Sequence, residues 1–575
     1  MNVRVHSLAA SSQYELDSAW SHRHPGGTDT SSIYFSSGMD AAGLNRSDVS
    51  ASAETRSQNY TRMYSFGVNA PYISKGIALC YTVNMVPKIC LVLTENTIDK
   101  NIQLIERYRS WIDIVELRAD FLDPQELLYI RRFPKLARIP AILTIRRFLD
   151  GGTFKGGEGS RITLFARGLS FADTEPLNNF AFLDLESDVQ ASSLEEAAQA
   201  FNIGIIRSVH SIKAPIKDIA TKIRDIRRTD EEIVKIAYKA DNLTDVTALF
   251  KQTQQLNGQN ILIAMGKYGI PSRILAAKLH SSIVYTMPRE YIVQHHLEQE
   301  FIDPITLNEL YHFRTINGET SIYGVVGTDT TRSLSPAIHN KGFERKGINA
   351  VYIPISAADS KEVIAFADCT GIAGLSVTHP FKFDIIPFLD SIGPASTACG
   401  AVNTVLFDGG KRRGFNTDID GFSRALQEFL HVRSLRFKHI AIIGTGGAAH
   451  AVANAVHLLH GKACIFGRSA EKAKQLAGRY NFRWAVSDLA SVRTLKKYSD
   501  VIIQATSVGM HENEDPLEFY SFSGSEKVFD VIYTPEKTAL LKRAEAAGCD
   551  ICNGYDMLRY QAYKQFELFT GGSYE

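Results

Sequence analysis

Net charge is almost absent from this sequence, which has 63 lysines and arginines against 62 aspartates and glutamates, a formal net charge of +1. Without an excess of one sign, no global field favours binding to nucleic acid or to an anionic membrane. Long apolar runs are also absent. The nearest approach, residues 77–93, is interrupted by Asn84, Pro87 and Lys88 and falls short of the roughly 18 residues that mark a membrane-spanning helix. We therefore expect neither a nucleic-acid partner nor a membrane partner.

Cysteines are few, since the chain has only seven, an odd number scattered over its whole length. This pattern is unlike the disulfide framework of a small secreted protein. No apolar stretch typical of a secretory signal follows the first residues, and Glu15, Asp17 and Asp29 argue against a transit peptide. We expect the protein to be cytoplasmic.

The chain has 575 residues, which at roughly 150 residues per domain predicts three or four domains. Apolar residues make up 45% and charged residues 22%, as in ordinary globular proteins. Residues 1–84 differ, because they are rich in Ser, Tyr, Asn and Gly and show no periodicity. We predict that 1–84 is a disordered or loosely packed, dispensable extension, and that Met85 is an alternative translation start.

From residue 88 onward, short β-branched runs alternate with amphipathic helical stretches. Eight such runs precede residue 287: 88–93, 112–117, 140–145, 180–185, 204–209, 233–238, 260–265 and 282–286. This alternation predicts an α/β protein that begins with a (β/α)₈ barrel, at 85–315. A second α/β region should follow, with one lobe at 320–430 and a Rossmann-like nucleotide-binding domain at 431–552. A C-terminal helix at 553–575 should return to the substrate lobe.

Polar residues recur where the barrel strands should end, which is where the active sites of such barrels form. They are Glu116, Arg118, Asp120, Arg146, Glu186, His210 and Lys235, and the apolar Met265 closes the seventh strand. Lys235 interrupts an apolar strand and should point into the barrel. An amine in apolar surroundings is disfavoured as a cation and can attack a ketone to form an imine. His210 would act as the base, and Arg118, Arg146 and Arg273 would bind an anionic substrate.

The motifs VELRAD (115–120), TIRR followed by GG (144–152), SVH (208–210), VKIA (234–237) and AMGKYGIPSR (264–273) resemble type I 3-dehydroquinate dehydratase. The resemblance implies imine formation at Lys235, proton abstraction by His210, and a substrate held by Glu116, Arg118, Arg146, Arg273 and Met265. One feature departs from the family. Its S-A-P-G-Q loop after the eighth strand is replaced by residues 287–304, so that the loop's Ser and Gln have no counterpart.

A glycine turn, IIGTGGAAHAVANA (442–455), lies between a predicted strand and a helix. Gly444 would permit the tight turn, and Gly446 and Gly447 would let backbone N–H groups approach a pyrophosphate. After the next strand, Arg468 stands where an NAD-preferring site would carry an acid, so the residue favours NADP. A solvated surface role for Arg468 and a helix N-cap role for Ser469 remain alternatives.

Six further motifs resemble shikimate dehydrogenase: SLSPAIHN (333–340), LSVTHPFK (375–382), GAVNTV (400–405), GFNTDIDGF (414–422), QATSVGM (504–510) and NGYDMLRYQAYKQF (553–566). The resemblance implies that Lys382 and Asp418 form the catalytic pair. It assigns Ser333, Ser335, Thr378, Asn403 and Gln561 to the substrate, and it makes 320–430 the substrate-binding lobe of a two-lobed α/β dehydrogenase. Thr506 and Ser469, with the three glycines and Arg468, should contact the cofactor.

Together the two resemblances imply a bifunctional enzyme that converts 3-dehydroquinate to 3-dehydroshikimate and then, with NADPH, to shikimate. One alternative makes the barrel a non-catalytic binding or scaffolding module. Another makes the dehydrogenase act on quinate with NAD, against which Arg468 and the Ser333/Ser335 pair argue. The Cys549-x-x-Cys552 spacing and the His295–His296 pair lack a matching ligand set, so we expect structural and surface roles and no metal.

Overall fold

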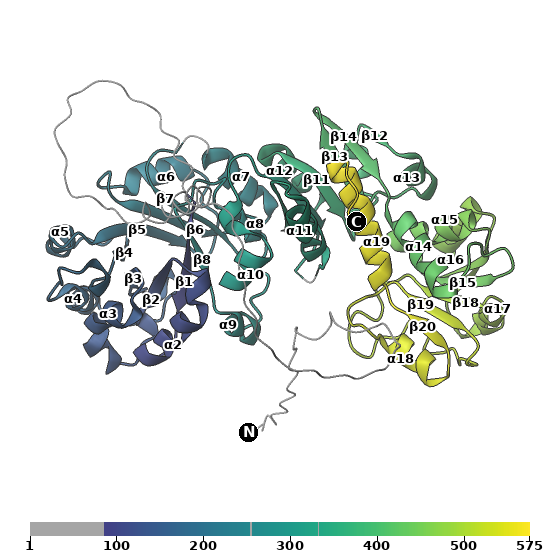
Figure 1. Cartoon of the computed structure of the whole chain (residues 1–575), viewed down its shortest axis with the longest axis horizontal. Helices are drawn as coiled ribbons and strands as arrows, with labels where there is room; N and C mark the ends of the chain where they lie inside the picture. Colours follow the sequence, from purple (N-terminus) through teal and green to yellow (C-terminus); the bar gives the residue numbers. More distant parts are fainter. Residues whose placement is uncertain (1–85, 254–255, 332) are drawn as a thin grey trace, which may run out of the picture. The chain divides into compact units, whose positions relative to one another are not determined.

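The structure is a computed structural model that describes residues 86–253, 256–331 and 333–575. The predicted extension at 1–84 and Met85 lie outside the described residues. Eight parallel strands form the first sheet (Figure 1). They are β1 (Lys88–Leu93), β2 (Ile114–Arg118), β3 (Ala141–Thr144), β4 (Phe182–Glu186), β5 (Gly204–Ser211), β6 (Ile233–Lys239), β7 (Asn260–Met265) and β8 (Ile283–Thr286).

The sheet curls into a nearly closed barrel, because β1 pairs with both β2 and β8. The last seam, between β7 and β8, is held by a bridge between Asn260 and Ser281 and by a hydrogen bond from Ser282 N–H to the Asn260 carbonyl. This confirms the (β/α)₈ prediction, and every predicted strand lies within two residues of an observed one.

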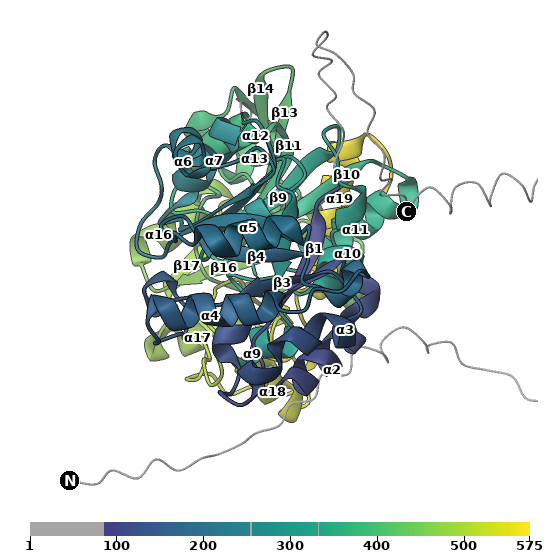
Figure 2. The same cartoon turned by 90° about the vertical axis from the view of Figure 1, so that its left-hand side faces the viewer.

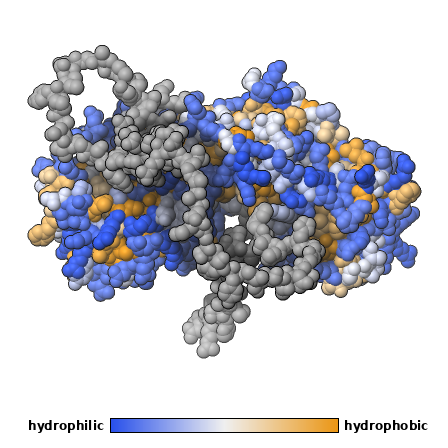
Figure 3. Space-filling model, in the orientation of Figure 1, coloured by the Kyte–Doolittle hydropathy of each residue, from blue (hydrophilic) through white to orange (hydrophobic). Residues whose placement is uncertain are grey.

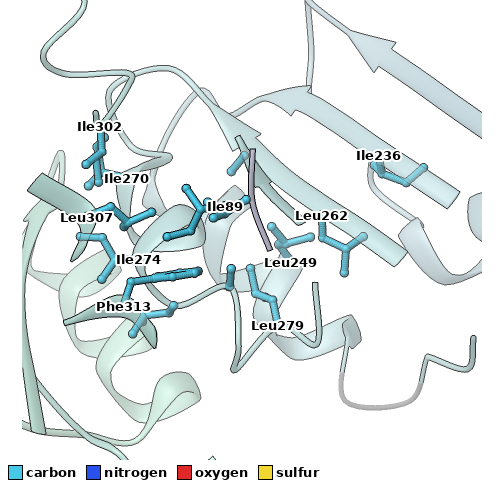
Figure 4. Close-up of a cluster of buried hydrophobic side chains, with 14 of the residues drawn as sticks. Ile89, Ile236, Leu249, Leu262, Ile270, Ile274, Leu279, Ile302, Leu307 and Phe313 are labelled. Atoms are coloured by element: carbon cyan, nitrogen blue, oxygen red, sulfur yellow. The ribbon is translucent and has the colours of Figure 1, made fainter. Parts of the chain in front are cut away.

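Helices follow most barrel strands and lie outside them; Figure 2 shows α4 and α5 in front of β3 and β4. They are α2 (Ile98–Tyr108), α3 (Phe133–Ala137), α4 (Glu158–Leu169), α5 (Ser192–Ala200), α6 (Ile219–Ile226), α7 (Leu243–Thr253) and α8 (Ile270–Ile274). After β8 come α9 (Arg289–Gln294) and α10 (Pro304–Glu309). Ile270 and Ile274 of α8 pack beside Leu307 and Phe313, which follow the barrel (Figure 4). This apolar contact anchors the chain as it leaves the barrel.

The second sheet has six strands in the order β10-β9-β11-β13-β14-β12, with antiparallel pairing at β11/β13 and β13/β14. Its strands are β9 (Ser321–Gly327), β10 (Ala350–Ser356), β11 (Ile372–Val377), β12 (Ser391–Ile392), β13 (Thr404–Asp408) and β14 (Lys411–Phe415). Its helices are α11 (Ser335–Lys346), α12 (Ser360–Thr370), α13 (Pro394–Cys399) and α14 (Asp418–Leu430).

The third sheet is wholly parallel, in the order β17-β16-β15-β18-β19-β20. This is the strand order of the dinucleotide-binding doubly wound fold. Its strands are β15 (His439–Ile443), β16 (Lys462–Gly467), β17 (Arg483–Val486), β18 (Val501–Gln504), β19 (Lys527–Asp530) and β20 (Asp550–Cys552). Its helices are α15 (Gly447–Leu458), α16 (Ala470–Arg479), α17 (Val492–Lys497) and α18 (Ala539–Ala546).

The last helix, α19 (Tyr555–Thr570), packs on α14 and on the second sheet. Its Gln565 side chain accepts a hydrogen bond from Ser376 Oγ at 2.7 Å and donates one to Thr404 Oγ1 at 3.0 Å. Phe566 and Phe569 bury their rings against Tyr323 and Phe343. The end of the chain therefore completes the core of the substrate lobe.

Hydrophilic residues predominate on the face shown in Figure 3, and the apolar ones form scattered patches. In the described part of the chain, no helix is both long enough and apolar enough to cross a bilayer.

Candidate active sites

The barrel interior holds a buried lysine between two carboxylates. Lys235 of β6 is 3% exposed, and its Nζ lies 3.1 Å from Glu116 Oε1 and 2.9 Å from Asp184 Oδ2. The prediction that Lys235 points into the barrel matches this placement, but its surroundings are not apolar as we expected. Inward-facing residues of β2 and β4 meet β6 across the barrel, so the carboxylates supply counter-charges that the sequence of β6 alone does not show.

Arg146 is held by carboxylates of the same cluster. It forms ion pairs with Asp184 at 2.8 Å and Glu186 at 2.7 Å, and donates to Ser208 Oγ at 3.1 Å. Burial opposes the Arg146 cation, but Asp184 and Glu186 outweigh it and raise the pKa of the guanidinium above its ordinary value. Arg146 is therefore a fixed positive charge beside Lys235.

His210 of β5 supplies a neutral imidazole. Its Nδ1 is buried and has no hydrogen-bond partner in residues 86–253, 256–331 and 333–575. Burial, and then the positive charges of Arg146 and Lys235, lower the pKa of His210 well below its ordinary value. A neutral ring with an unpartnered nitrogen can accept a proton from a substrate.

The other predicted barrel ligands lie around this cluster. Arg118 pairs with Asp120 at 2.8 Å, and Arg273 donates to the Ala264 carbonyl at 3.0 Å. Burial lowers the pKa of Arg273 to about 10, so it stays charged at neutral pH. Met265 ends β7 and packs against the apolar lining of the barrel.

Residues 287–304, which replace the family's loop, fold back over the barrel lining. Met287, Ile292, Leu297 and Phe301 pack with the inward apolar residues of the strands. The Phe301 ring lies 5.0 Å from the Arg273 guanidinium carbon, a cation–π distance. An aromatic ring thus covers part of the predicted anion site.

In the dehydrogenase half, Lys382 and Asp418 form a direct ion pair with Nζ–Oδ2 at 2.5 Å. Lys382 follows β11, and Asp418 begins α14 with an exposed fraction of 5%. Asn403 donates to the other Asp418 oxygen at 2.8 Å, which fixes the carboxylate for its lysine partner.

The predicted substrate ligands fall into two groups. Asn403 Nδ2 also contacts Thr417 Oγ1 at 3.0 Å and Gln561 Oε1 at 3.4 Å, so Gln561 on α19 is linked through Asn403 to the predicted catalytic pair. Ser333 Oγ accepts from the Ser335 N–H at 3.3 Å, at the start of α11. Thr378 directly follows β11 and donates its N–H to the Val326 carbonyl of the adjacent β9.

The glycine turn lies against Lys382, the predicted catalytic lysine. Gly444 has φ of +125°, and a Cβ there would lie 2.8 Å from the Ala505 carbonyl oxygen. Gly446 caps α15 and Gly447 begins it, where a Cβ would lie 3.0 Å from Lys382 Cδ. At Gly444 the positive φ and the close backbone require glycine, and the three glycines leave the N-terminus of α15 open to an anionic group.

The residues predicted to bind the adenosine end differ in role. Arg468 is exposed directly after β16. Ser469 is the N-cap of α16, and its Oγ accepts the Lys472 N–H at 3.4 Å, so the N-cap alternative matches this placement. Thr506 Oγ1 accepts the Val508 N–H at 3.1 Å in the loop after β18.

Our sequence reasoning missed two inward-facing barrel residues, Asp184 and Tyr285. Asp184 precedes Glu186 by two positions, and Tyr285 follows the inward Ile283 by two. The period-two alternation of strands was the signal that could have placed both side chains inside.

The weaker motifs carry no assembled site. Cys549 precedes β20 and Cys552 ends it, and His295 Nδ1 contacts the Tyr291 carbonyl at 2.9 Å. His296 is exposed. Within the described ranges, no group of His, Cys, Asp and Glu has the geometry of a metal site.

Fold and sites together define a (β/α)₈-barrel enzyme joined to a two-lobed dehydrogenase. The family model for type I 3-dehydroquinase matches residues 89–317. Those for the shikimate dehydrogenase substrate-binding domain and for shikimate/quinate 5-dehydrogenase match 325–405 and 425–511.

A bifunctional 3-dehydroquinate dehydratase/shikimate dehydrogenase of Arabidopsis thaliana is 29% identical over 84% of this chain and 82% of its own length. An NADP(+) shikimate dehydrogenase of Pyrococcus furiosus is 37% identical over 44% of this chain and 92% of its own. A crystal structure of the Aquifex aeolicus shikimate dehydrogenase is 32% identical and covers 45% of this chain and 95% of its own, with a TM-score of 0.42. The chain belongs to the shikimate dehydrogenase family, and a type I 3-dehydroquinase domain precedes its dehydrogenase half.

Proposed function

We propose that this chain catalyses two consecutive reactions of the shikimate pathway. The barrel dehydrates 3-dehydroquinate to 3-dehydroshikimate, and the dehydrogenase half reduces that product to shikimate with NADPH. The observation that carries the proposal is that each half holds a lysine paired with an acid at its site, Lys235 with Asp184 and Lys382 with Asp418.

In the barrel, Lys235 passes a proton to a neighbouring carboxylate, and its amine attacks the substrate ketone. Loss of water gives an imine, which acidifies the adjacent C–H. His210 removes that proton and then donates it to the hydroxyl group on the next carbon, which leaves as water. Hydrolysis of the imine then releases the product and restores the lysine. Arg146 and Arg273 face the substrate carboxylate.

In the dehydrogenase, Lys382 donates the proton that the carbonyl oxygen takes up on reduction, and Asp418 holds the ammonium in place. NADPH supplies the hydride when bound. The residues present fit this cofactor, because Gly444, Gly446 and Gly447 leave the start of α15 free of Cβ atoms and Arg468 is exposed beyond β16.

A borohydride experiment tests the barrel reaction. We expect 3-dehydroquinate plus borohydride to label Lys235, as mapped by mass spectrometry. In a separate assay, the purified protein should consume NADPH when 3-dehydroquinate is the only substrate supplied with it. Lys239→Ala, an exposed lysine of the same strand, is the control and should be labelled like the wild type. Turnover with an unlabelled Lys235 would contradict the covalent mechanism.

One observation favours a second function, a non-catalytic barrel that binds the cyclic acid. The two carboxylates on Lys235 and the ring over Arg273 occupy groups that the reaction needs. That function predicts binding of 3-dehydroquinate without turnover and without an adduct.

The partners in this proposal are 3-dehydroquinate, 3-dehydroshikimate and shikimate, with no nucleic acid. We also propose a cytoplasmic location. The six described cysteines are all free thiols, which fits a reducing compartment. Fractionation of cells that express the tagged protein tests this location.

A further inference from the structure

Tyr285 places a phenol inside the barrel. It lies on β8 in register with Cys90 of β1, and both side chains belong to the cluster that lines the interior. Tyr285 is 6% exposed. It belongs to none of the motifs on which the family resemblance rests, and β8 is the strand after which the family's loop is replaced.

The Tyr285 ring contacts the reactive lysine. The ring centroid lies 3.9 Å from Lys235 Nζ, a close cation–π contact in a buried site. With Glu116 and Asp184, the ring is a third contact that restricts where the amine can lie.

The Tyr285 hydroxyl is buried and has no hydrogen-bond partner among the residues that the structure describes. Unpartnered buried hydroxyls are rare in folded proteins, because burying one forfeits its hydrogen bonds to water. Burial, and then the negative charge of Glu116, raise the pKa of the phenol well above its ordinary value, so it stays a protonated donor. The His210 Nδ1 and Arg273 Nε atoms are also buried and unpartnered in the same half. A polar ligand would satisfy such groups.

We propose that Tyr285 is a further substrate-binding residue of the barrel, whose ring positions the Lys235 amine and whose hydroxyl donates a hydrogen bond to an oxygen of the bound cyclic acid. The inference rests on the proposed dehydratase function. Glu116 and Asp184 can only accept hydrogen bonds, and both already accept one from Lys235. The Tyr285 hydroxyl adds a neutral donor, which an oxygen of the substrate can accept.

Two variants separate the ring from the hydroxyl. Tyr285→Phe keeps the ring, so we expect KM for 3-dehydroquinate to rise roughly 3- to 10-fold, the scale of one neutral hydrogen bond. Its kcat and its rate of borohydride labelling should stay within about two-fold of the wild type. Tyr285→Leu removes the ring as well, so labelling of Lys235 should slow and the pH dependence of labelling should shift. Tyr311 is a buried tyrosine beyond β8. Tyr311→Phe is therefore the control, and it should change neither KM for 3-dehydroquinate nor the rate at which Lys235 is labelled.

A wild-type KM in Tyr285→Phe would overturn the role of the hydroxyl. Wild-type labelling kinetics in a folded Tyr285→Leu protein would overturn the role of the ring. If Tyr285→Leu fails to fold, the Tyr285→Phe comparison still decides the hydroxyl. A wild-type protein with neither turnover nor adduct would refute the proposed dehydratase, and this inference with it; an active wild type with an unchanged Tyr285→Phe refutes this inference alone.

Discussion

His210 should determine how dehydratase activity in the barrel responds to acid. Its folded-state pKa lies below the ordinary value of about 6.5, so the ring is neutral above that pH and becomes charged only at a lower one. A neutral ring would be the active base, so we expect kcat/KM for dehydration to hold through pH 6.5 and to fall only at a pH well below it. The measurement is the pH profile of kcat/KM for dehydration, with a check that the protein stays folded at each pH. An acid limb centred above pH 6.5 would exclude His210 as its source, and His210→Asn should remove most of the activity at every pH.

Arg468 should set the cofactor preference of the dehydrogenase half. Its exposed guanidinium follows β16, where a 2′-phosphate would lie. Loss of a charge-assisted contact should cost about 1.5–3 kcal/mol of NADPH binding and leave NADH binding nearly unchanged. The measurement is the KM of Arg468→Ala for each cofactor, with Arg483→Ala, exposed on the neighbouring β17, as the control. An equal loss for both cofactors would assign Arg468 to folding instead.

At the scale of an element, residues 287–304 should limit access to the barrel. The Phe301 ring covers Arg273, and a substrate carboxylate must displace that contact. A cation–π contact contributes about 1 kcal/mol, so Phe301→Ala should lower KM for 3-dehydroquinate roughly five-fold. Phe171→Ala, at 93% exposure, is the control for losing a phenyl ring. A raised KM in Phe301→Ala would show that the segment helps to bind the substrate.

At the scale of the whole molecule, the two halves touch but should work separately. Helix α7 of the barrel packs on α12 of the substrate lobe, where the Phe250 and Phe366 rings meet edge to face at 5.7 Å. No described side chain at one site hydrogen-bonds to the other. Lys382→Ala should therefore abolish reduction and leave dehydration near normal, and Lys235→Ala should do the reverse. Separate assays with 3-dehydroquinate and with 3-dehydroshikimate check this. Loss of both activities in one folded variant would show that the halves depend on each other.

The order of the elements was predictable from the sequence because it is local information. Alternating β-branched runs and amphipathic stretches repeat every few tens of residues, and each observed barrel strand lies within two residues of its predicted place. The glycine turn at 444–447 was equally visible, since a positive φ and a close backbone approach both demand glycine.

The partners of the site residues were decided only by the tertiary structure. Lys235 meets Glu116 and Asp184 from strands 119 and 51 residues earlier in the chain, and Gln561 reaches Asn403 from a helix 158 residues later. Phe301 lies on Arg273 although it belongs to a segment without the family's motif. A sequence pattern shows which side of its own strand a residue faces. Closure of the barrel and the return of α19 bring distant strands and helices together, and those contacts determine which charges compensate one another.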